Sequence, residues 1–154
     1  MNEYISYLNE GTLADCVRIC MSTIGYRAGI FVTSDEEALN VIQEFTDGVF
    51  RFWNDNSLPV HITHIVKSRN RSYIAFNNRS AIHIGVCRDG GRGMRLHRIL
   101  VDKKIDSNTI NTLLSPLVRK YDASKWDDCR RQQMQNEADV LFKLEYSDVN
   151  KTTV

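Results

Sequence analysis

Apolar and polar residues follow two different periods along the first part of the chain, and each period predicts a type of element. Helical spacing connects Leu13, Val17, Cys20 and Ile24. This spacing predicts an amphipathic helix over residues 11–24, which is entered through the polar turn Asn9–Thr12 and broken by Gly25. The short apolar run at 28–33 is typical of a buried strand.

A second helix is predicted directly after this strand. Ser34 is a favoured N-cap residue, and Glu37 stands three positions later, which is the spacing of a capping box. The helix covers residues 35–46. Its apolar positions, which we expect to be buried, are Ala38, Leu39, Ile42 and Phe45. A strand followed by a cap and a helix of these lengths is the βα unit of an α/β protein.

The middle of the chain is rich in strand-forming residues. Strands are predicted at 60–66, 72–76 and 81–86. The last two form a hairpin around Asn77–Ser80, because asparagine tolerates a positive φ in a tight turn. A further strand at 97–101 follows the glycine-containing loop 90–93.

The last third of the chain begins with a helix capped by Asp106 or Ser107. Its expected buried face consists of Ile110, Leu113, Leu114 and Leu117. Pro116 predicts a kink or an early end of this helix. Another helix at 125–135 and a final strand at 140–146 are predicted beyond it.

These elements predict a single α/β domain over residues 1–146, with a mixed, largely parallel sheet flanked by helices. The polar residues 147–154 are expected to form a flexible tail. A chain of 154 residues is long enough to bury a real core. It contains no apolar run long enough to span a membrane.

The N-terminal sequence has no basic segment followed by an apolar one, so no secretory signal is expected. The four cysteines form no Cys-x-x-Cys pair, and we expect them to be reduced in a cytoplasmic protein. Cys16 and Cys20 share a helical face and are expected in the core. His61 and His64 do not predict a metal pair, and single histidines such as His83 and His97 are expected to be structural.

Charge is distributed unevenly although the net charge is only +1. Residues 67–104 contain ten Lys or Arg and two acids, so this segment carries about +8 and the rest of the chain about −7. One interpretation is an anionic partner for the basic segment. The other is that these charges are solvated or neutralised within the fold.

Three stretches together resemble the ATPase core of phage DNA-packaging terminases. They are "AGIFVTSDEEALNVIQEF" (28–45), "RSYIAFNNRSAIHIGV" (71–86) and "GGRGMRLHRILVD" (90–102). The hairpin motif of that family is matched by Ile74, Phe76, Asn78, Ser80 and Ile82. Gly91, Arg92 and Gly93 match its arginine-glycine loop, and Asp102 matches the Walker B aspartate at the end of a strand. The resemblance covers residues 11–120 and implies a fold like that of P-loop nucleotide hydrolases.

The sequence also departs from this family at the residues that carry its chemistry. The phosphate-binding signature G-x-x-x-x-G-K-[ST] is absent, and the turn before the first helix, Leu8–Leu13, contains no lysine. Lys103 occupies the position of the glutamate that activates water. The resemblance therefore implies a degenerate relative without catalytic residues or a resident cofactor, which does not hydrolyse ATP efficiently.

The leading functional prediction is a phage-encoded, non-catalytic protein of the host cytoplasm that binds nucleic acid, or an acidic protein surface, through residues 67–104. The candidate contacts are Arg69, Arg71, Arg88, Arg92, Arg95, Arg98, Lys103 and Lys104. Two alternatives remain open. One is a subunit that still binds ATP with Mg²⁺ and is completed by another chain, through Gly11, Thr12, Gly91, Gly93 and Asp102. The other is an inhibitor of a host system that acts by binding protein.

Overall fold

The computed structural model of the chain describes residues 3–48, 50, 58–67, 72–87 and 94–126. The chain divides into two units, residues 1–121 and 122–154, and of the second unit residues 122–126 are described. The strands are β1 (Ile5–Tyr7), β2 (Arg27–Val32), β3 (Ile62–Val66), β4 (Ser72–Phe76), β5 (Ala81–Val86) and β6 (Arg98–Val101). The helices are α1 (Glu10–Ser22), α2 (Asp35–Thr46), α3 (Ser107–Thr109), η2 (Ile110–Leu114), η3 (Ser115–Leu117) and η4 (Ala123–Trp126).

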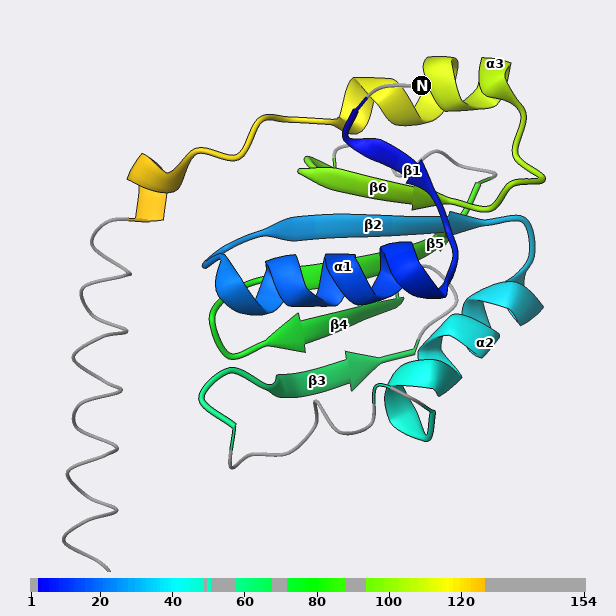
Figure 1. Ribbon diagram of the computed structural model, residues 1–154. Coiled ribbons are helices and arrows are strands. Elements are labelled where there is room, and N and C mark those ends of the chain that lie inside the picture. Colours follow the sequence, from blue (N-terminus) through cyan, green and yellow to red (C-terminus); the bar gives the residue numbers. More distant parts are fainter. Residues whose placement is uncertain (1–2, 49, 51–57, 68–71, 88–93, 127–154) are drawn as a thin grey trace, which may run out of the picture. The chain divides into compact units, whose positions relative to one another are not determined.

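All six strands belong to one sheet in the order β1-β6-β2-β5-β4-β3 (Figure 1). The strands β1, β6, β2 and β5 run parallel to one another, whereas β4 is antiparallel to both of its neighbours, β5 and β3. The sheet is therefore mixed and largely parallel, as the sequence predicted. β2 lies in its centre and is buried after its first residue, because a central parallel strand is covered on both faces.

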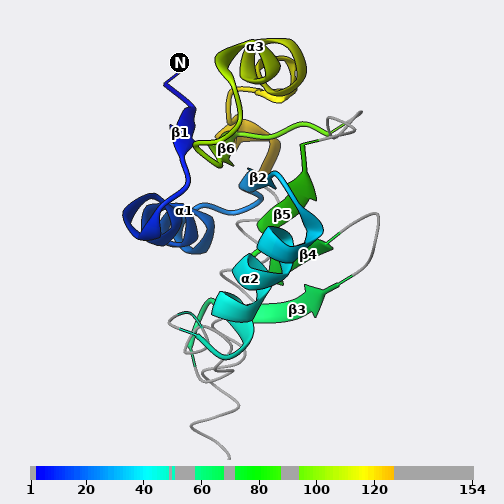
Figure 2. The ribbon, with the colours of Figure 1, turned by 90° about the vertical axis from the view of Figure 1, so that its right-hand side faces the viewer.

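Helices α1 and α2 cover one face of the sheet (Figure 2), which we call the helical face. α1 buries Leu13, Cys16, Val17 and Cys20 against this face. α2 buries Val41, Ile42 and Phe45. Leu39 is 50% exposed, so its predicted burial is wrong. Val41 takes its place because the contact stripe of α2 is centred on Ile42 and Phe45.

The segment from Ile105 to Leu117 packs on the opposite face, over β1, β6 and β2. Asp106 is its N-cap and accepts a hydrogen bond from the Thr109 N–H (2.6 Å). The helix widens at η2, tightens at η3 around Pro116 and ends at Val118, so the predicted early end is confirmed. Leu113 is 37% exposed, which contradicts its predicted burial, because this irregular helix turns only Ile110, Leu114 and Leu117 inward.

The hairpin between β4 and β5 is confirmed, but a different residue adopts the strained conformation. Arg79 has φ 68°, whereas the prediction assigned the positive φ to an asparagine. Neither asparagine has a positive φ, and their side chains form hydrogen bonds to distant parts of the chain: Asn77 to His61 and Pro59, and Asn78 to Cys20. Gly25 also has a positive φ, 70°, which explains why the chain turns there after α1.

The predicted helix at 125–135 extends past the last described residue, and the predicted strand at 140–146, the domain boundary at 146 and the tail at 147–154 all lie outside the described residues. Every helix in the described part of the chain is too short or too polar to cross a bilayer.

Candidate functional site

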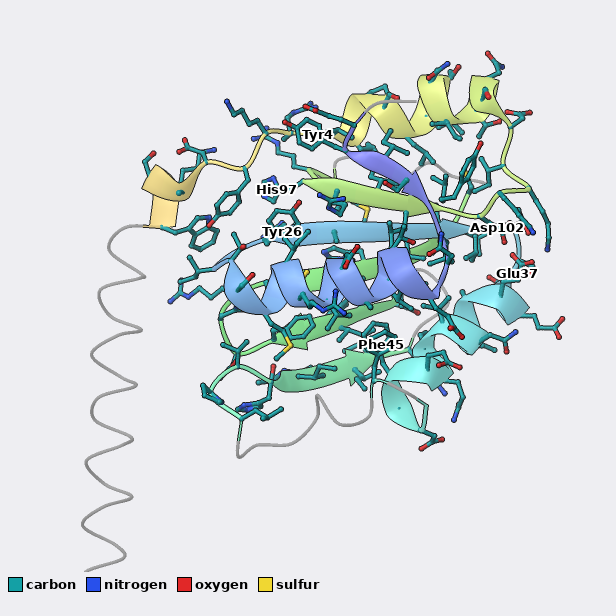
Figure 3. The ribbon with its side chains drawn as sticks, in the orientation of Figure 1. Tyr4, Tyr26, Glu37, Phe45, His97 and Asp102 are labelled. Atoms are coloured by element: carbon teal, nitrogen blue, oxygen red, sulfur yellow. The ribbon has the colours of Figure 1, made fainter. Side chains whose placement is uncertain are left out.

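The sheet has two edges with different chemistry. The register of β1 and β2 against β6 brings the residues that follow all three strands side by side, at what we call the carboxyl edge. The chain enters the same strands at the opposite, amino edge. Figure 3 shows Asp102 and Glu37 at the carboxyl edge, and Tyr26 and His97 at the amino edge.

The turn between β1 and α1, which includes the candidate nucleotide residues Gly11 and Thr12, is closed by its own side chains. Asn9 Oδ1 accepts a hydrogen bond from the Thr12 N–H (2.9 Å), and Thr12 Oγ1 accepts one from the Asn9 N–H (3.0 Å). The Thr12 hydroxyl donates to the carbonyl of Tyr7 (2.7 Å). A helix N-terminus binds phosphate through free N–H groups. Here the Asn9 side chain already accepts the hydrogen bond of the Thr12 N–H. The arrangement therefore gives no support to nucleotide binding at this turn.

Asp102 lies directly after β6, where it stabilises a turn. Its Oδ1 accepts a hydrogen bond from the Lys104 N–H (2.9 Å). The Lys104 ammonium in turn donates to Glu37 Oε1. Glu37 Oε2 accepts hydrogen bonds from the N–H (3.1 Å) and the hydroxyl (2.8 Å) of Thr33. The predicted capping box of α2 is thus only half formed. The Ser34 hydroxyl does accept from the Glu37 N–H (3.2 Å), but the Glu37 carboxylate reaches Thr33 and Lys104.

These contacts shift two pKa values in opposite directions. Hydrogen bonds from Lys104 and then from Thr33 lower the pKa of Glu37 to about 2, from an ordinary value of 4.5. The same pairing with Glu37 raises the pKa of Lys104. The pair links the first turn of α2 to the turn after β6, so it fixes the geometry of the carboxyl edge.

A pH titration of stability tests this pair. Because the folded pKa of Glu37 is depressed, its contribution to the free energy of unfolding is complete above 4.5 and is lost as the pH falls towards about 2. We expect Glu37→Gln to destabilise the protein at pH 7 and to become indistinguishable from the wild type near pH 2. Urea unfolding of both proteins measures this. Lys104→Met removes the partner of Glu37, and Lys103→Met is its matched control. Equal effects of these two substitutions on stability would contradict the pairing.

The candidate basic residues do not share one edge. Arg95 precedes β6 at the amino edge, whereas Lys103 and Lys104 follow it at the carboxyl edge. Arg98 opens β6, and its half-buried side chain lies beside Tyr26 on the helical face. The described residues do not include the other basic candidates, Arg69, Arg71, Arg88 and Arg92. The candidate nucleotide residues Gly91 and Gly93 also lie outside them.

The Asn78 and Ser80 positions of the hairpin motif have a structural role. Both side chains are buried, with exposed fractions of 3% and 1%. Asn78 Nδ2 and the Ser80 hydroxyl each donate to the carbonyl of Cys20 (2.7 Å in both cases), which lies in the last turn of α1. The Gly25 N–H donates to the Asn78 carbonyl (3.1 Å). The hairpin thus caps the C-terminus of α1, where carbonyl groups lack helical partners.

A row of basic residues extends along the amino edge. Its exposed members, which we call the amino-edge basic row, are Arg27, Arg79, Arg95, Arg119 and Lys120. Backbone contacts make the row continuous. Arg27 pairs with Ala81, two positions after Arg79, and its carbonyl accepts the His97 N–H (2.7 Å). The Arg119 N–H donates to the carbonyl of Leu96 (2.7 Å), which follows Arg95.

No member of this row forms an ion pair with a carboxylate in the described part of the chain, where the ion pairs join Arg18 to Asp15 and Lys104 to Glu37. The reason is that acidic residues are placed elsewhere. α1 and α2, with the turns that follow α2 and β6, carry Glu10, Asp15, Asp35, Glu36, Glu37, Glu44, Asp47, Asp102 and Asp106. The described exceptions are Glu3, before β1, and Asp122, two positions after Lys120 in the sequence. The uneven charge seen in the sequence is therefore also uneven in space.

Three aromatic rings contact one another next to the row, in tilted and edge-on arrangements. The ring centroids of Tyr26, His97 and Tyr121 lie 5.3–5.6 Å apart. His97 Nδ1 is 3.0 Å from the carbonyl of Arg119, and the Tyr121 hydroxyl donates to the carbonyl of Ile24 (2.5 Å). His97 thus has the structural role expected for it. These contacts hold the starts of β2 and β6 against residues 119–121.

Sequence reasoning missed Arg27, Arg79, Arg119 and Lys120 as candidate contacts, because they are spread over nearly a hundred positions. One signal was available. Arg27 immediately precedes an apolar run, which marks the point where a buried strand leaves solvent, and basic residues at several such points gather at one edge when the strands are parallel.

Metal binding also finds no support in the described residues, where no three His, Cys, Asp or Glu side chains are grouped to hold an ion. Comparisons of this chain with protein family models, with curated proteins and with solved structures find no match.

Proposed function

We propose that this chain is a non-catalytic protein that binds nucleic acid, and that the amino-edge basic row contacts the phosphate backbone. The observation that carries the proposal is the absence of ion pairs between these five exposed cations and any described carboxylate. Cations without a carboxylate partner on adjacent segments bind polyanions by releasing condensed counterions. The Arg119 guanidinium also donates to the carbonyls of Pro116 (2.7 Å) and Val118 (2.8 Å). An isolated exposed cation would not have this effect, whereas a continuous row follows a backbone.

The proposed partner is nucleic acid, as the sequence suggested, but the proposed contact surface is the amino-edge basic row and not the segment 67–104. Of the sequence candidates in the described chain, Arg95 belongs to the row. Lys104 is committed to Glu37, and Arg98 is half-buried. The terminase-like origin, and action in a host cytoplasm, rest on the sequence motifs alone. The closed turn at Asn9 and the lysine at position 103 both agree with a scaffold that does not hydrolyse ATP.

Salt-dependent binding tests this proposal. Fluorescence anisotropy with labelled 20-nucleotide strands and duplexes, of DNA and of RNA, is measured at 50–200 mM salt. We expect the affinity to fall linearly on a logarithmic scale, with a slope of roughly 0.7–0.9 for each phosphate contact. The double variant Arg27→Gln/Arg79→Gln is expected to lower the slope by about two contacts and the affinity on the order of 50-fold near 100 mM salt.

The matched control is Arg18→Gln/Lys103→Gln, which removes the same charge from α1 and from the carboxyl edge. We expect it to change affinity by less than about threefold, since its charges lie away from the row. Absence of binding at 50 mM salt would overturn the proposal, and so would equal losses in the two double variants. Binding of an acidic protein in place of nucleic acid would also count against it.

A further inference from the structure

The face of the sheet opposite α1 and α2 is left uncovered by described helices over β5, β4 and β3 (Figure 2). The Ile105–Leu117 segment packs on β1, β6 and β2 only. We call the remaining area the open face. It consists of His64 and Val66 on β3, Tyr73 and Ala75 on β4, and Ala81, His83 and Gly85 on β5.

The register shows that the rings on this face are neighbours. Tyr73 lies directly opposite His83 in the antiparallel pair β4–β5, and Val66 lies opposite Tyr73 on the other side. The ring centroids of Tyr73 and His83 are 6.0 Å apart, with the planes tilted by 46°. Both side chains are only half-buried. The next pair along the same strands is Ala75 and Ala81, whose side chains are much smaller than the two rings.

The open face is continuous with the amino-edge basic row. Arg27 pairs with Ala81 in the β2–β5 register, so its exposed side chain points to the same face as the ring pair. Arg79 lies in the turn that enters β5. No described acidic residue belongs to the strands β2, β3, β4 or β5. A ring pair beside unpaired cations is suited to a polyanion that also carries flat groups.

Single-stranded nucleic acid has this combination of groups. Its phosphates are contacted by cations, while its unstacked bases lie flat on aromatic side chains, as on the sheets of many RNA-binding modules. A duplex has the same phosphates, but its bases are stacked on one another and do not reach a protein ring. The ring pair therefore favours a single strand over a duplex.

We propose that the partner is single-stranded nucleic acid, whose bases stack on Tyr73 and His83 of the open face while its backbone follows Arg27 and Arg79. This inference rests on the proposed function. DNA and RNA share the chemistry, because both present a π face on every base.

The first experiment uses the unmodified protein and three labelled probes of equal length: a single strand, the same strand with abasic sites, and a duplex. We expect the ordinary strand to bind roughly 5- to 150-fold more tightly than the abasic strand, which is the usual effect of stacking one base on an aromatic ring. We also expect it to bind more tightly than the duplex. DNA and RNA versions of each probe show which backbone is preferred.

Variants then assign the effect to the ring pair. Tyr73→Leu is expected to lower single-strand affinity within the same 5- to 150-fold range while leaving the salt slope unchanged, because stacking releases no counterions. Tyr73→Phe keeps the ring and is expected to bind like the wild type. Circular dichroism confirms that both variants are folded.

The outcomes separate the two proposals. If the abasic strand binds as tightly as the ordinary one, or if the duplex binds more tightly, stacking on the open face is wrong although the basic row can still bind phosphate. The same conclusion follows if Tyr73→Leu and Tyr73→Phe are equal. If no probe binds at 50 mM salt, the proposed function and this inference both fail.

Discussion

Leu114→Ala is expected to lower the free energy of unfolding by about 2–5 kcal/mol, which is the largest effect that we predict. Leu114 is fully buried in η2, in the cluster that also contains Ile99, Val101 and Ile110. Removing its side chain leaves a cavity between the helix and the sheet, because the irregular helix is held by β6 on one side and by Pro116 at its end. Urea denaturation at pH 7 measures the change.

The adjacent residue provides the control for this prediction. Leu113 is chemically identical but 37% exposed. We expect Leu113→Ala to cost less than about 1 kcal/mol, because less apolar surface is returned to water and no closed cavity forms. Equal effects of the two substitutions would show that this helix packs on the sheet with a different face.

Asn78→Ala is expected to lower the free energy of unfolding by about 1–3 kcal/mol, although it removes no apolar contact. The Asn78 amide donates to the carbonyls of Cys20 (2.7 Å) and Met21 (3.4 Å), and its Oδ1 accepts from the Ser80 N–H (3.1 Å). All these groups lie at the buried junction of the hairpin with α1. Without the side chain, they lose their partners in a place that water does not reach.

Two further substitutions make this prediction specific. Asn40→Ala, at an exposed position of α2, is the matched control and is expected to change stability by less than about 0.5 kcal/mol. Ser80→Ala is expected to be non-additive with Asn78→Ala, because Ser80 donates both to Cys20 and to the Asn78 side chain. If Asn78→Ala were neutral, the hairpin would not act as a cap for α1.

Local patterns predicted most elements of this fold, but not the three-residue edge strand β1. The predicted helix at 35–46 matches α2, and the predicted hairpin matches β4 and β5. These elements depend on interactions within a few residues: an N-cap side chain, an apolar stripe, a tight turn. The wrong predictions concern residues whose burial depends on packing between distant parts of the chain. Leu39 and Leu113 have the right hydrophobicity and period, but the axis of each helix over the sheet turns them outward.

The hairpin motif shows the same division. Its spacing was visible in the sequence, and Ile74, Phe76 and Ile82 are buried in the core as alternation requires. The role of Asn78 was not visible, because its partner Cys20 stands 58 positions away. A buried asparagine in a turn has the same local signature as an exposed one, so only the packing of the hairpin against α1 distinguishes them.

The sequence by itself determined that this protein is an α/β chain with a mixed, largely parallel sheet, and that its cations outnumber its acids in one long segment. Tertiary structure alone decided which cations are neighbours. Parallel strands bring their starting residues to one edge, so Arg27, Arg79, Arg95 and Arg119 become neighbours while Lys104 is drawn to Glu37 at the other edge. Charge along a chain is a linear property, whereas binding depends on distances in space that strand order and register set.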